Sequence, residues 1–274
     1  PMGEPVGIYL ETQGILIVGT GTVTDEHGVE RNPANDVVQS GDYITAVNGK
    51  SIAGKEDLVD LVADNGAAPV SLTVRNQKER EVMITPVQSG DNEFKLGIWI
   101  RDDTQGIGTM SYLTTDGKYG ALGHGISDMD TGLLIESGSG TLYDAHIHSI
   151  LKGSGNTPGS VCGSINYDDS FRIGTIKKNC SAGIYGDYDM SRGIPSGVEP
   201  VPVGYMQEVE TGEAFIRSSI SGESKDYRIE IVRMDKSNSN NKGLVIRVTD
   251  PELLALTGGI VQGMSGSPIL QNGK

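Results

Sequence analysis

The sequence contains no run of about 18 apolar residues, the length that a helix needs to cross a membrane, so these 274 residues are not expected to span one. It also lacks an excess of basic residues, because 22 Lys and Arg face 36 Asp and Glu and the net charge is −14. No basic stripe interrupts this acidity, which argues against binding to nucleic acid. The first five residues carry no signal-peptide pattern, and a chain that begins with Pro1 suggests a trimmed or processed product.

Cysteines and long helical patterns are also scarce. Cys162 and Cys180 are the only two cysteines, and we expect two free buried thiols, with a disulfide as the alternative that their even number leaves open. By contrast, 39 glycines and many short runs rich in Val and Ile indicate a mostly β protein. A chain of this length has room for two domains, each with its own core.

Residues 1–88 form the first expected domain. Its elements are strands at 7–10 and 15–18, a strand at 41–49 that ends in an Asn-Gly turn, a helix at 55–62 and a closing hairpin at 70–75 and 81–87. This order resembles a PDZ domain of the kind found with bacterial proteases, and PDZ domains bind an extended peptide at a sheet edge beside a helix. The resemblance implies that a loop with Val6, Gly7 and Ile8 holds the peptide carboxylate. The alternative is a PDZ fold that serves only as a brace.

Residues 89–95 are polar and are expected to form a linker, after which short strands alternate with Gly, Asp and Ser turns. That pattern fits a pair of packed antiparallel barrels, and we expect a trypsin- or chymotrypsin-like double β-barrel over residues 96–274. The strands are expected at 96–100, 106–113, 133–136, 142–150, 160–166, 170–176, 182–185, 201–205, 212–218, 227–234 and 244–248.

Ser265 is the candidate nucleophile, because it lies in the segment Gly-Met-Ser-Gly-Ser-Pro at 263–268, between two apolar stretches. Glycines on both sides let the backbone turn tightly and aim consecutive N–H groups at one point. The N–H groups of Gly263 and Ser265 are the expected donors of an oxyanion hole. The segment resembles the Gly-Asp-Ser-Gly-Gly-Pro turn of chymotrypsin-like peptidases. The alternative is a Gly/Ser turn that joins two strands.

A serine nucleophile needs a histidine to accept its proton, and the chain has four. His124 is the best candidate, because glycines on both sides leave its imidazole uncovered. His27 lies in a polar turn of the first domain. His146 and His148 alternate along a strand, where they form a polar face or half of a metal site that lacks a clear third ligand.

The histidine in turn needs a carboxylate that fixes its tautomer. Asp250 closes an apolar strand and precedes Pro251, so it stands at a strand end that leads into the loop with Ser265. Asp128 follows His124 closely, but carboxylates at such short range more often form turns with their own backbone. Asp250 is therefore preferred, with Asp128 as its competitor.

Two stretches of the sequence, 119–128 and 248–269, strongly resemble the SpoIVB peptidases of endospore-forming bacteria, and the resemblance covers essentially the whole chain. It implies a self-cleaving serine endopeptidase with His124, Asp250 and Ser265 as its triad and with no metal or organic cofactor. It further implies export to the space between forespore and mother cell, with a membrane anchor that would precede Pro1. The implied protein substrates are the enzyme itself and a regulatory membrane protein whose cleavage triggers pro-sigma-K processing.

The chain departs from chymotrypsin-like enzymes in one respect, because only nine residues follow Ser265 and the strands that usually complete the second barrel are missing. We therefore expect the Ser265 region to be poorly held and catalysis by this chain to be weak or absent. The alternative from another class is a PDZ-bearing signalling or scaffold protein with a degenerate peptidase domain.

Overall fold

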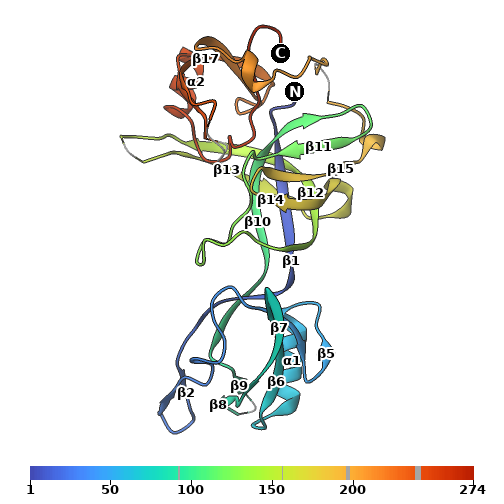
Figure 1. Cartoon of the computed structure of the whole chain (residues 1–274), viewed down its shortest axis with the longest axis vertical. Helices are drawn as coiled ribbons and strands as arrows, with labels where there is room; N and C mark the ends of the chain where they lie inside the picture. Colours follow the sequence, from blue (N-terminus) through green and yellow to red (C-terminus); the bar gives the residue numbers. More distant parts are fainter. Residues whose placement is uncertain (92, 156, 196–197, 238–241) are drawn as a thin grey trace. The chain divides into compact units, whose positions relative to one another are not determined.

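A computed structural model describes residues 1–274 with the exception of 92, 156, 196–197 and 238–241 (Figure 1). Two compact units share the chain. Unit 1 comprises Pro1–Tyr9, Gln105–Ile126 and Gly140–Lys274, and unit 2 comprises Leu10–Thr104 and Ser127–Ser139. None of the helices among the described residues is long and apolar enough to cross a membrane.

The secondary structure is mostly β. Unit 2 is built from part of β1 (Glu4–Thr20), β2 (Val23–Thr24), β3 (Glu30–Arg31), β4 (Tyr43–Val47), β5 (Lys50–Ser51), α1 (Lys55–Asn65), β6 (Val70–Asn76), β7 (Lys78–Ile84), β8 (Val87–Gly90), β9 (Glu93–Lys95) and the start of β10 (Ile98–Leu113). Unit 1 contains the rest of β1 and β10, β11 (Lys118–Ala121), most of β12 (Ser137–Leu151), β13 (Ser160–Ile165), β14 (Arg172–Cys180), β15 (Gly183–Tyr188), β16 (Gly212–Ser218), β17 (Lys225–Met234), β18 (Leu244–Val248), α2 (Pro251–Thr257) and β19 (Ile269–Leu270).

In unit 2, one helix covers a twisted antiparallel sheet. The apolar residues of β6 alternate with polar ones, so that Val70, Leu72 and Val74 all point into the core and are fully buried. Helix α1, which lies beside β6 in Figure 1, contributes Leu58 and Val62 to the same core. This packing of an amphipathic helix on the alternating face of a sheet confirms the expected helix, which runs three residues further than the sequence indicated.

Unit 1 contains two β layers of different kinds. Strands β12, β14, β15, β11, β10 and β1 pair in that order, and an additional pairing of β1 with β12 closes the ring. A separate sheet has the order β18-β17-β16-β19, and no pairing among the described residues closes it. Helix α2 lies beside β17 (Figure 1) and contributes Leu253 to a core that also contains Tyr227, Ile229, Val261 and Met264. The residues that flank the candidate nucleophile are therefore anchored in this second core.

The expected strands at 212–218 and 244–248 have the bounds that the sequence indicated, whereas two others are not strands. Residues 201–205 are irregular, since Pro202 has no N–H to donate and the side chains of Val203 and Tyr205 are exposed. Residues 133–136 have only an isolated bridge, between Leu134 and Ser127.

The expected linker 89–95 includes the end of β8 and the whole of its paired strand β9. The compact units also draw on different stretches from the ranges 1–88 and 96–274, because residues 1–9 belong to unit 1 and residues 127–139 belong to unit 2. Both cysteines are free, as expected, but neither is buried, because Cys162 is exposed and Cys180 is half-buried.

Candidate active site

Ser265 lies in a tight turn whose neighbours are fixed in the core. Val261 and Met264 are buried, and the Met264 N–H donates to the Val261 carbonyl at 3.2 Å. The glycines on either side of the serine have positive φ angles, 104° at Gly263 and 98° at Gly266, which residues with a Cβ rarely adopt. The side chain of Ser265 is half-buried. The turn thus presents a serine between two backbone positions whose φ angles favour glycine.

Gly266 also allows the turn to approach two other backbone segments. A Cβ atom at Gly266 would lie 2.2 Å from the Thr109 carbonyl oxygen and 2.6 Å from the Leu122 nitrogen. The Thr109 N–H donates to the Ser265 carbonyl at 3.1 Å. Because Leu122 lies two residues before His124, the structure brings the nucleophile turn against the segment that leads into the candidate base.

His124 follows a sharp bend at the end of β11, where Leu122 and Gly123 both have φ near 72°. Its imidazole is exposed, and Nδ1 lies 2.9 Å from the Gly125 carbonyl oxygen. A carbonyl can only accept, so this contact favours a proton on Nδ1, which in the neutral ring leaves the lone pair on Nε2. That tautomer is the one that a base needs to take a proton from serine. Among the described residues, the Ser265 hydroxyl makes no hydrogen bond to this ring.

Asp250 is the N-cap of α2. One carboxylate oxygen accepts the N–H groups of Glu252 and Leu253 at 2.9 and 3.1 Å, and the other accepts the N–H of Arg228 at 3.3 Å. Burial raises the pKa of Asp250, but the N–H donors of Leu253, Arg228 and Glu252 outweigh it and hold the pKa below its usual value. No hydrogen bond joins Asp250 to His124 among the described residues.

Asp128 is a turn former, which is the role that its sequence position favoured. Its side chain is fully buried in unit 2, where Oδ1 accepts the N–H groups of Asp130 and Thr131 at 3.1 and 2.8 Å. Oδ2 lies 2.9 Å from the Nε of Arg101. This carboxylate is thus bonded through Oδ1 to its own turn and ion-paired through Oδ2 with one guanidinium, although Oδ2 accepts no well-oriented hydrogen bond from a described residue.

The expected oxyanion donors are unoccupied by protein acceptors. No hydrogen bond between described residues uses the N–H of Gly263 or of Ser265. By contrast, the four successive carbonyls of residues 262–265 each accept a hydrogen bond from a described residue. A backbone with its carbonyls tied back and its N–H groups open is suited to stabilise a developing negative charge.

Residues 92–274 match the family model of the SpoIVB peptidase S55, which covers more than half of the chain, including all of the residues just described. The chain belongs to this family. Residues 18–89 match the family model of the Tricorn protease PDZ domain. No curated protein matches the chain. The protein is therefore a SpoIVB-like serine peptidase that carries a PDZ-like domain and acts on protein substrate.

Among the described residues, none of the remaining histidines of this SpoIVB-like peptidase forms a hydrogen bond with the nucleophile turn. His146 and His148 are in β12, and the His148 Nε2 lies 2.8 Å from the Ser164 hydroxyl of the neighbouring strand β13. His27 is exposed in a turn of unit 2, near Glu26. The described residues contain no group of three or more His, Cys, Asp or Glu side chains placed to hold a metal ion.

The structure places Val6, Gly7 and Ile8 differently from the loop that the sequence suggested. All three are buried in β1 within unit 1, not in a loop of the PDZ-like unit. A Cβ at Gly7 would lie 2.6 Å from the side chain of Ile165, so this glycine serves close packing. These residues therefore offer no exposed N–H groups to a peptide carboxylate.

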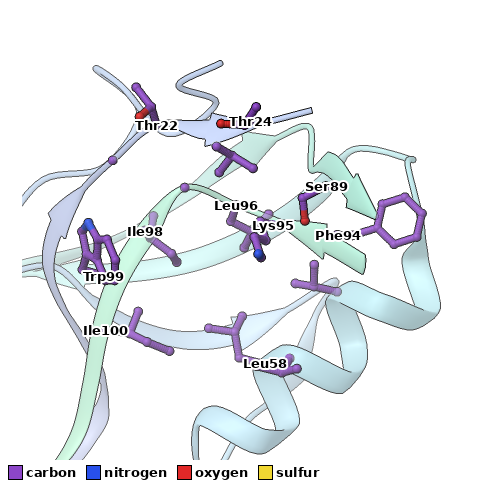
Figure 2. A pocket seen from close by; sticks show the side chains of 15 residues that line it. Thr22, Thr24, Leu58, Ser89, Phe94, Lys95, Leu96, Ile98, Trp99 and Ile100 are labelled. Atoms are coloured by element: carbon purple, nitrogen blue, oxygen red, sulfur yellow. The ribbon is translucent and has the colours of Figure 1, made fainter. Parts of the chain in front are cut away.

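The PDZ-like unit has its groove elsewhere, at Leu96-Gly97-Ile98 (Figure 2). A cavity of about 620 Å³ is lined there by apolar side chains of α1, β9 and β10, with Leu58, Phe94, Leu96, Ile98 and Ile100 prominent in the figure. Gly97 has a φ of 67°, and a Cβ there would lie 2.8 Å from the Gly21 carbonyl oxygen. The sequence has the same apolar-Gly-apolar pattern at 6–8 and at 96–98. The two copies can be told apart only in the structure, where residues 96–98 line the cavity beside α1.

Proposed function

We propose that this chain is a self-cleaving serine endopeptidase in which Ser265, His124 and Asp250 form the triad. The observation that carries the proposal is the packing of the Ser265 turn on the backbone that leads into His124, within a region that the SpoIVB peptidase model matches. The tautomer of His124 and the open N–H groups at the turn support the same assignment.

The mechanism follows from the roles of these groups. His124 Nε2 takes the proton from the Ser265 hydroxyl as the oxygen attacks the scissile carbonyl. The N–H groups of Gly263 and Ser265 stabilise the oxyanion that develops. His124 then gives the proton to the leaving amine, and water repeats the cycle on the acyl-enzyme. Asp250 stabilises the imidazolium and holds its orientation; this step requires its carboxylate to reach Nδ1, in place of the Gly125 carbonyl that accepts Nδ1–H in the structure.

For the biological role, we propose that the enzyme cleaves itself and a regulatory membrane protein, and that the second cut triggers pro-sigma-K processing during sporulation. The proposed location is the space between forespore and mother cell, with a membrane anchor on the amino-terminal side. The match to the SpoIVB peptidase family supports this role. Its test is whether the purified chain cleaves the candidate membrane protein in vesicles and whether Ser265→Ala abolishes the cut.

A fluorophosphonate probe tests the chemistry directly, because it reacts only with a serine activated by a base. We expect the wild-type chain to be labelled at Ser265, and the Ser265→Ala and His124→Ala variants to remain unlabelled. His148→Ala is the matched control, since it removes an exposed histidine that is bonded to Ser164 rather than to the turn. Absence of labelling in folded wild type would favour the non-catalytic scaffold instead.

We also propose that the groove of unit 2 binds an extended apolar peptide, which the cavity beside α1 favours. Trp99 is the only tryptophan of the chain, it lines the groove, and it is 67% exposed. Peptides with apolar carboxyl ends should therefore shift its fluorescence to shorter wavelength in the Ser265→Ala chain. Val59→Glu, which places a charge on the exposed groove face of α1, should weaken binding at least about tenfold by burying an unpaired charge. If the Ser265→Ala chain binds the peptide equally well with and without Val59→Glu, the groove does not bind it, and the PDZ fold would serve only as a structural brace.

A further inference from the structure

We infer that Thr109 is a positioning residue of the peptidase, which holds the Ser265 turn and the His124 segment in register and keeps the oxyanion hole open. The inference rests on the proposed function of Ser265. Thr109 lies in β10 and is only 4% exposed. It is outside the proposed triad, and its hydrogen bonds run to the backbone of the turn, so its role is exerted through that backbone.

Three hydrogen bonds meet at this one residue. Its hydroxyl donates to the Gly263 carbonyl at 2.7 Å, and its N–H donates to the Ser265 carbonyl at 3.1 Å. Its own carbonyl accepts the N–H of Leu122, also at 3.1 Å. Thr109 thus binds both sides of Met264 in the nucleophile turn and, at the same time, the chain two residues before His124.

Among the described residues, the Thr109 hydroxyl is the only side-chain group that donates to a carbonyl of residues 262–265. The four successive carbonyls from Gln262 to Ser265 are all tied back, those of Gln262 and Met264 by the N–H groups of Val161 and Ser267. The carbonyls of Gly263 and Ser265 are held by Thr109, and only that of Gly263 depends on a side chain. A substitution can therefore release this one carbonyl while the other three bonds are retained.

Release of that carbonyl should disturb catalysis more than binding. The peptide group that carries this carbonyl is held by two hydrogen bonds, one from the Thr109 hydroxyl and one from the Met264 N–H to the Val261 carbonyl. Because Gly263 has no Cβ to restrict rotation, loss of the Thr109 bond leaves only the weaker second bond to keep the carbonyl away from the oxyanion site. A released carbonyl that turns toward the site would repel the oxyanion and displace the N–H donors. Because a misplacement of about 1 Å in a catalytic group costs on the order of a hundredfold in rate, we expect kcat to fall by about tenfold to a hundredfold. The KM should change by less than about threefold, since the oxyanion exists only in the transition state.

The experiment compares Thr109→Val, Thr109→Cys and Thr109→Ser with the wild-type chain. Valine keeps the shape of threonine and removes the donor, cysteine retains a weak S–H donor, and serine retains the hydroxyl. We expect kcat to follow donor strength, with serine near wild type, cysteine intermediate and valine lowest. Affinity for a peptide aldehyde, which mimics the tetrahedral intermediate, should fall in the same order and in proportion to kcat.

Tyr119→Phe is the matched control. It removes another buried hydroxyl of unit 1, which donates to the Thr175 carbonyl at 3.1 Å, away from the turn. We expect this variant to lower the melting temperature but to leave kcat and aldehyde affinity unchanged. A purely structural role of Thr109 would give the valine variant the same pattern as Tyr119→Phe, and this result would overturn the inference.

Two outcomes separate this inference from the proposed function. Fluorophosphonate labelling of wild type at Ser265, together with equal labelling rates and equal kcat for Thr109→Val, would refute the role of Thr109 alone. Absence of labelling in the folded wild-type chain would refute the function and the inference with it. Should Thr109→Val fail to fold, the order of kcat among the threonine, serine and cysteine chains decides, and equal rates for all three would overturn the inference.

Discussion

The two candidate sites of this molecule are built from different parts of the polypeptide. The Ser265 turn in unit 1 is made of backbone, with its carbonyls bonded inward and with glycine where side chains would collide. The groove of unit 2 is made of apolar side chains on α1, β9 and β10. Catalysis needs hydrogen-bond donors that are fixed within a fraction of an ångström, and a hydrogen-bonded backbone provides such fixed donors. Peptide binding needs instead a surface that can adapt to the peptide. Substitutions should therefore affect rate in one unit and affinity in the other.

The largest effect is expected from Ser265→Ala. Loss of the nucleophile of a triad typically lowers the rate on the order of a million-fold. Self-cleavage and cleavage of a peptide substrate should both disappear, while the melting temperature and the Trp99 fluorescence of unit 2 should remain as in wild type. Self-cleavage that persists in this variant, with contaminating proteases excluded by inhibitors, would show that Ser265 is not the nucleophile.

Asp250→Asn should cost roughly ten-thousand-fold in kcat if Asp250 orients His124 during catalysis. This substitution separates the orienting role from the capping role, because asparagine caps a helix about as well as aspartate. Asp128→Asn is its counterpart in unit 2 and should cost far less activity, because Asp128 is bonded to Arg101 and to its own turn. Steady-state kinetics with one peptide substrate decides between them. A reversed order would make Asp128 the orienting acid, and full activity of Asp250→Asn would restrict Asp250 to capping.

Gly266→Ala should lower kcat by about a hundredfold or more. The new Cβ would lie 2.2 Å from the Thr109 carbonyl oxygen, so the turn would have to shift away from β10 and would displace Ser265. Gly259→Ala is the control, because Gly259 also has a positive φ, 140°, but has open space around it. Its expected cost is conformational only, about 1 kcal/mol of stability, with kcat retained. Equal kinetics for the two variants would mean that the close approach of the turn to Thr109 and Leu122 does not matter for catalysis.

Peptide binding to the groove should not respond to Ser265→Ala, Asp250→Asn or Gly266→Ala, the three changes in unit 1 that are expected to lower the rate. The converse test is Gly97→Ala, whose Cβ would lie 2.8 Å from the Gly21 carbonyl and so disturb the groove. We expect at least about tenfold weaker peptide binding by Trp99 fluorescence and an unchanged rate of labelling at Ser265. A parallel loss of labelling would show that the two sites are not independent.

Local features of the fold were predictable from the sequence, and long-range contacts were not. The helix at α1 and the strands β16 and β18 follow from periodicity, which is a property of a few neighbouring residues. The tight turn at Ser265 and the uncovered imidazole of His124 were predictable as well, because both depend on the conformational freedom of neighbouring glycines. By contrast, nothing in the sequence around Thr109 announces its bonds to residues more than 150 positions away.

The expectation that the Ser265 region is poorly held illustrates the same limit. It assumed that strands after the serine are needed to fix the turn, yet Thr109 and Val161 bond the turn from other strands. In addition, β19 directly after the turn pairs with β16 through Ile269 and Leu270. Pairing partners this distant cannot be read from local composition, because they depend on how the whole sheet closes. The expectation that catalysis by this chain is weak or absent stays a prediction, and the kinetic measurements described above test it.

The smallest expected effect concerns acid stability and again contrasts the two units. The pKa of Asp250 is held below its usual value by the N–H groups that it caps, so its carboxylate stabilises the folded state above the unfolded pKa of about 3.9. This contribution is lost as the pH falls through the lower pKa of the folded state. Asp250→Asn does not titrate, so its stability should decline less between about pH 5 and pH 2.

Urea unfolding at a series of pH values measures this difference, with circular dichroism reporting both units and Trp99 reporting unit 2. We expect the variant and the wild-type chain to differ in the pH dependence seen by circular dichroism but to agree in the transition seen by Trp99. If Asp250→Asn and wild type show the same pH dependence of unfolding, both by circular dichroism and by Trp99 fluorescence, the Asp250 cap contributes no measurable acid-sensitive stability to unit 1. A difference in the Trp99 transition as well would mean that the units unfold together, and the separation between a rigid catalytic unit and an independent binding unit would fail.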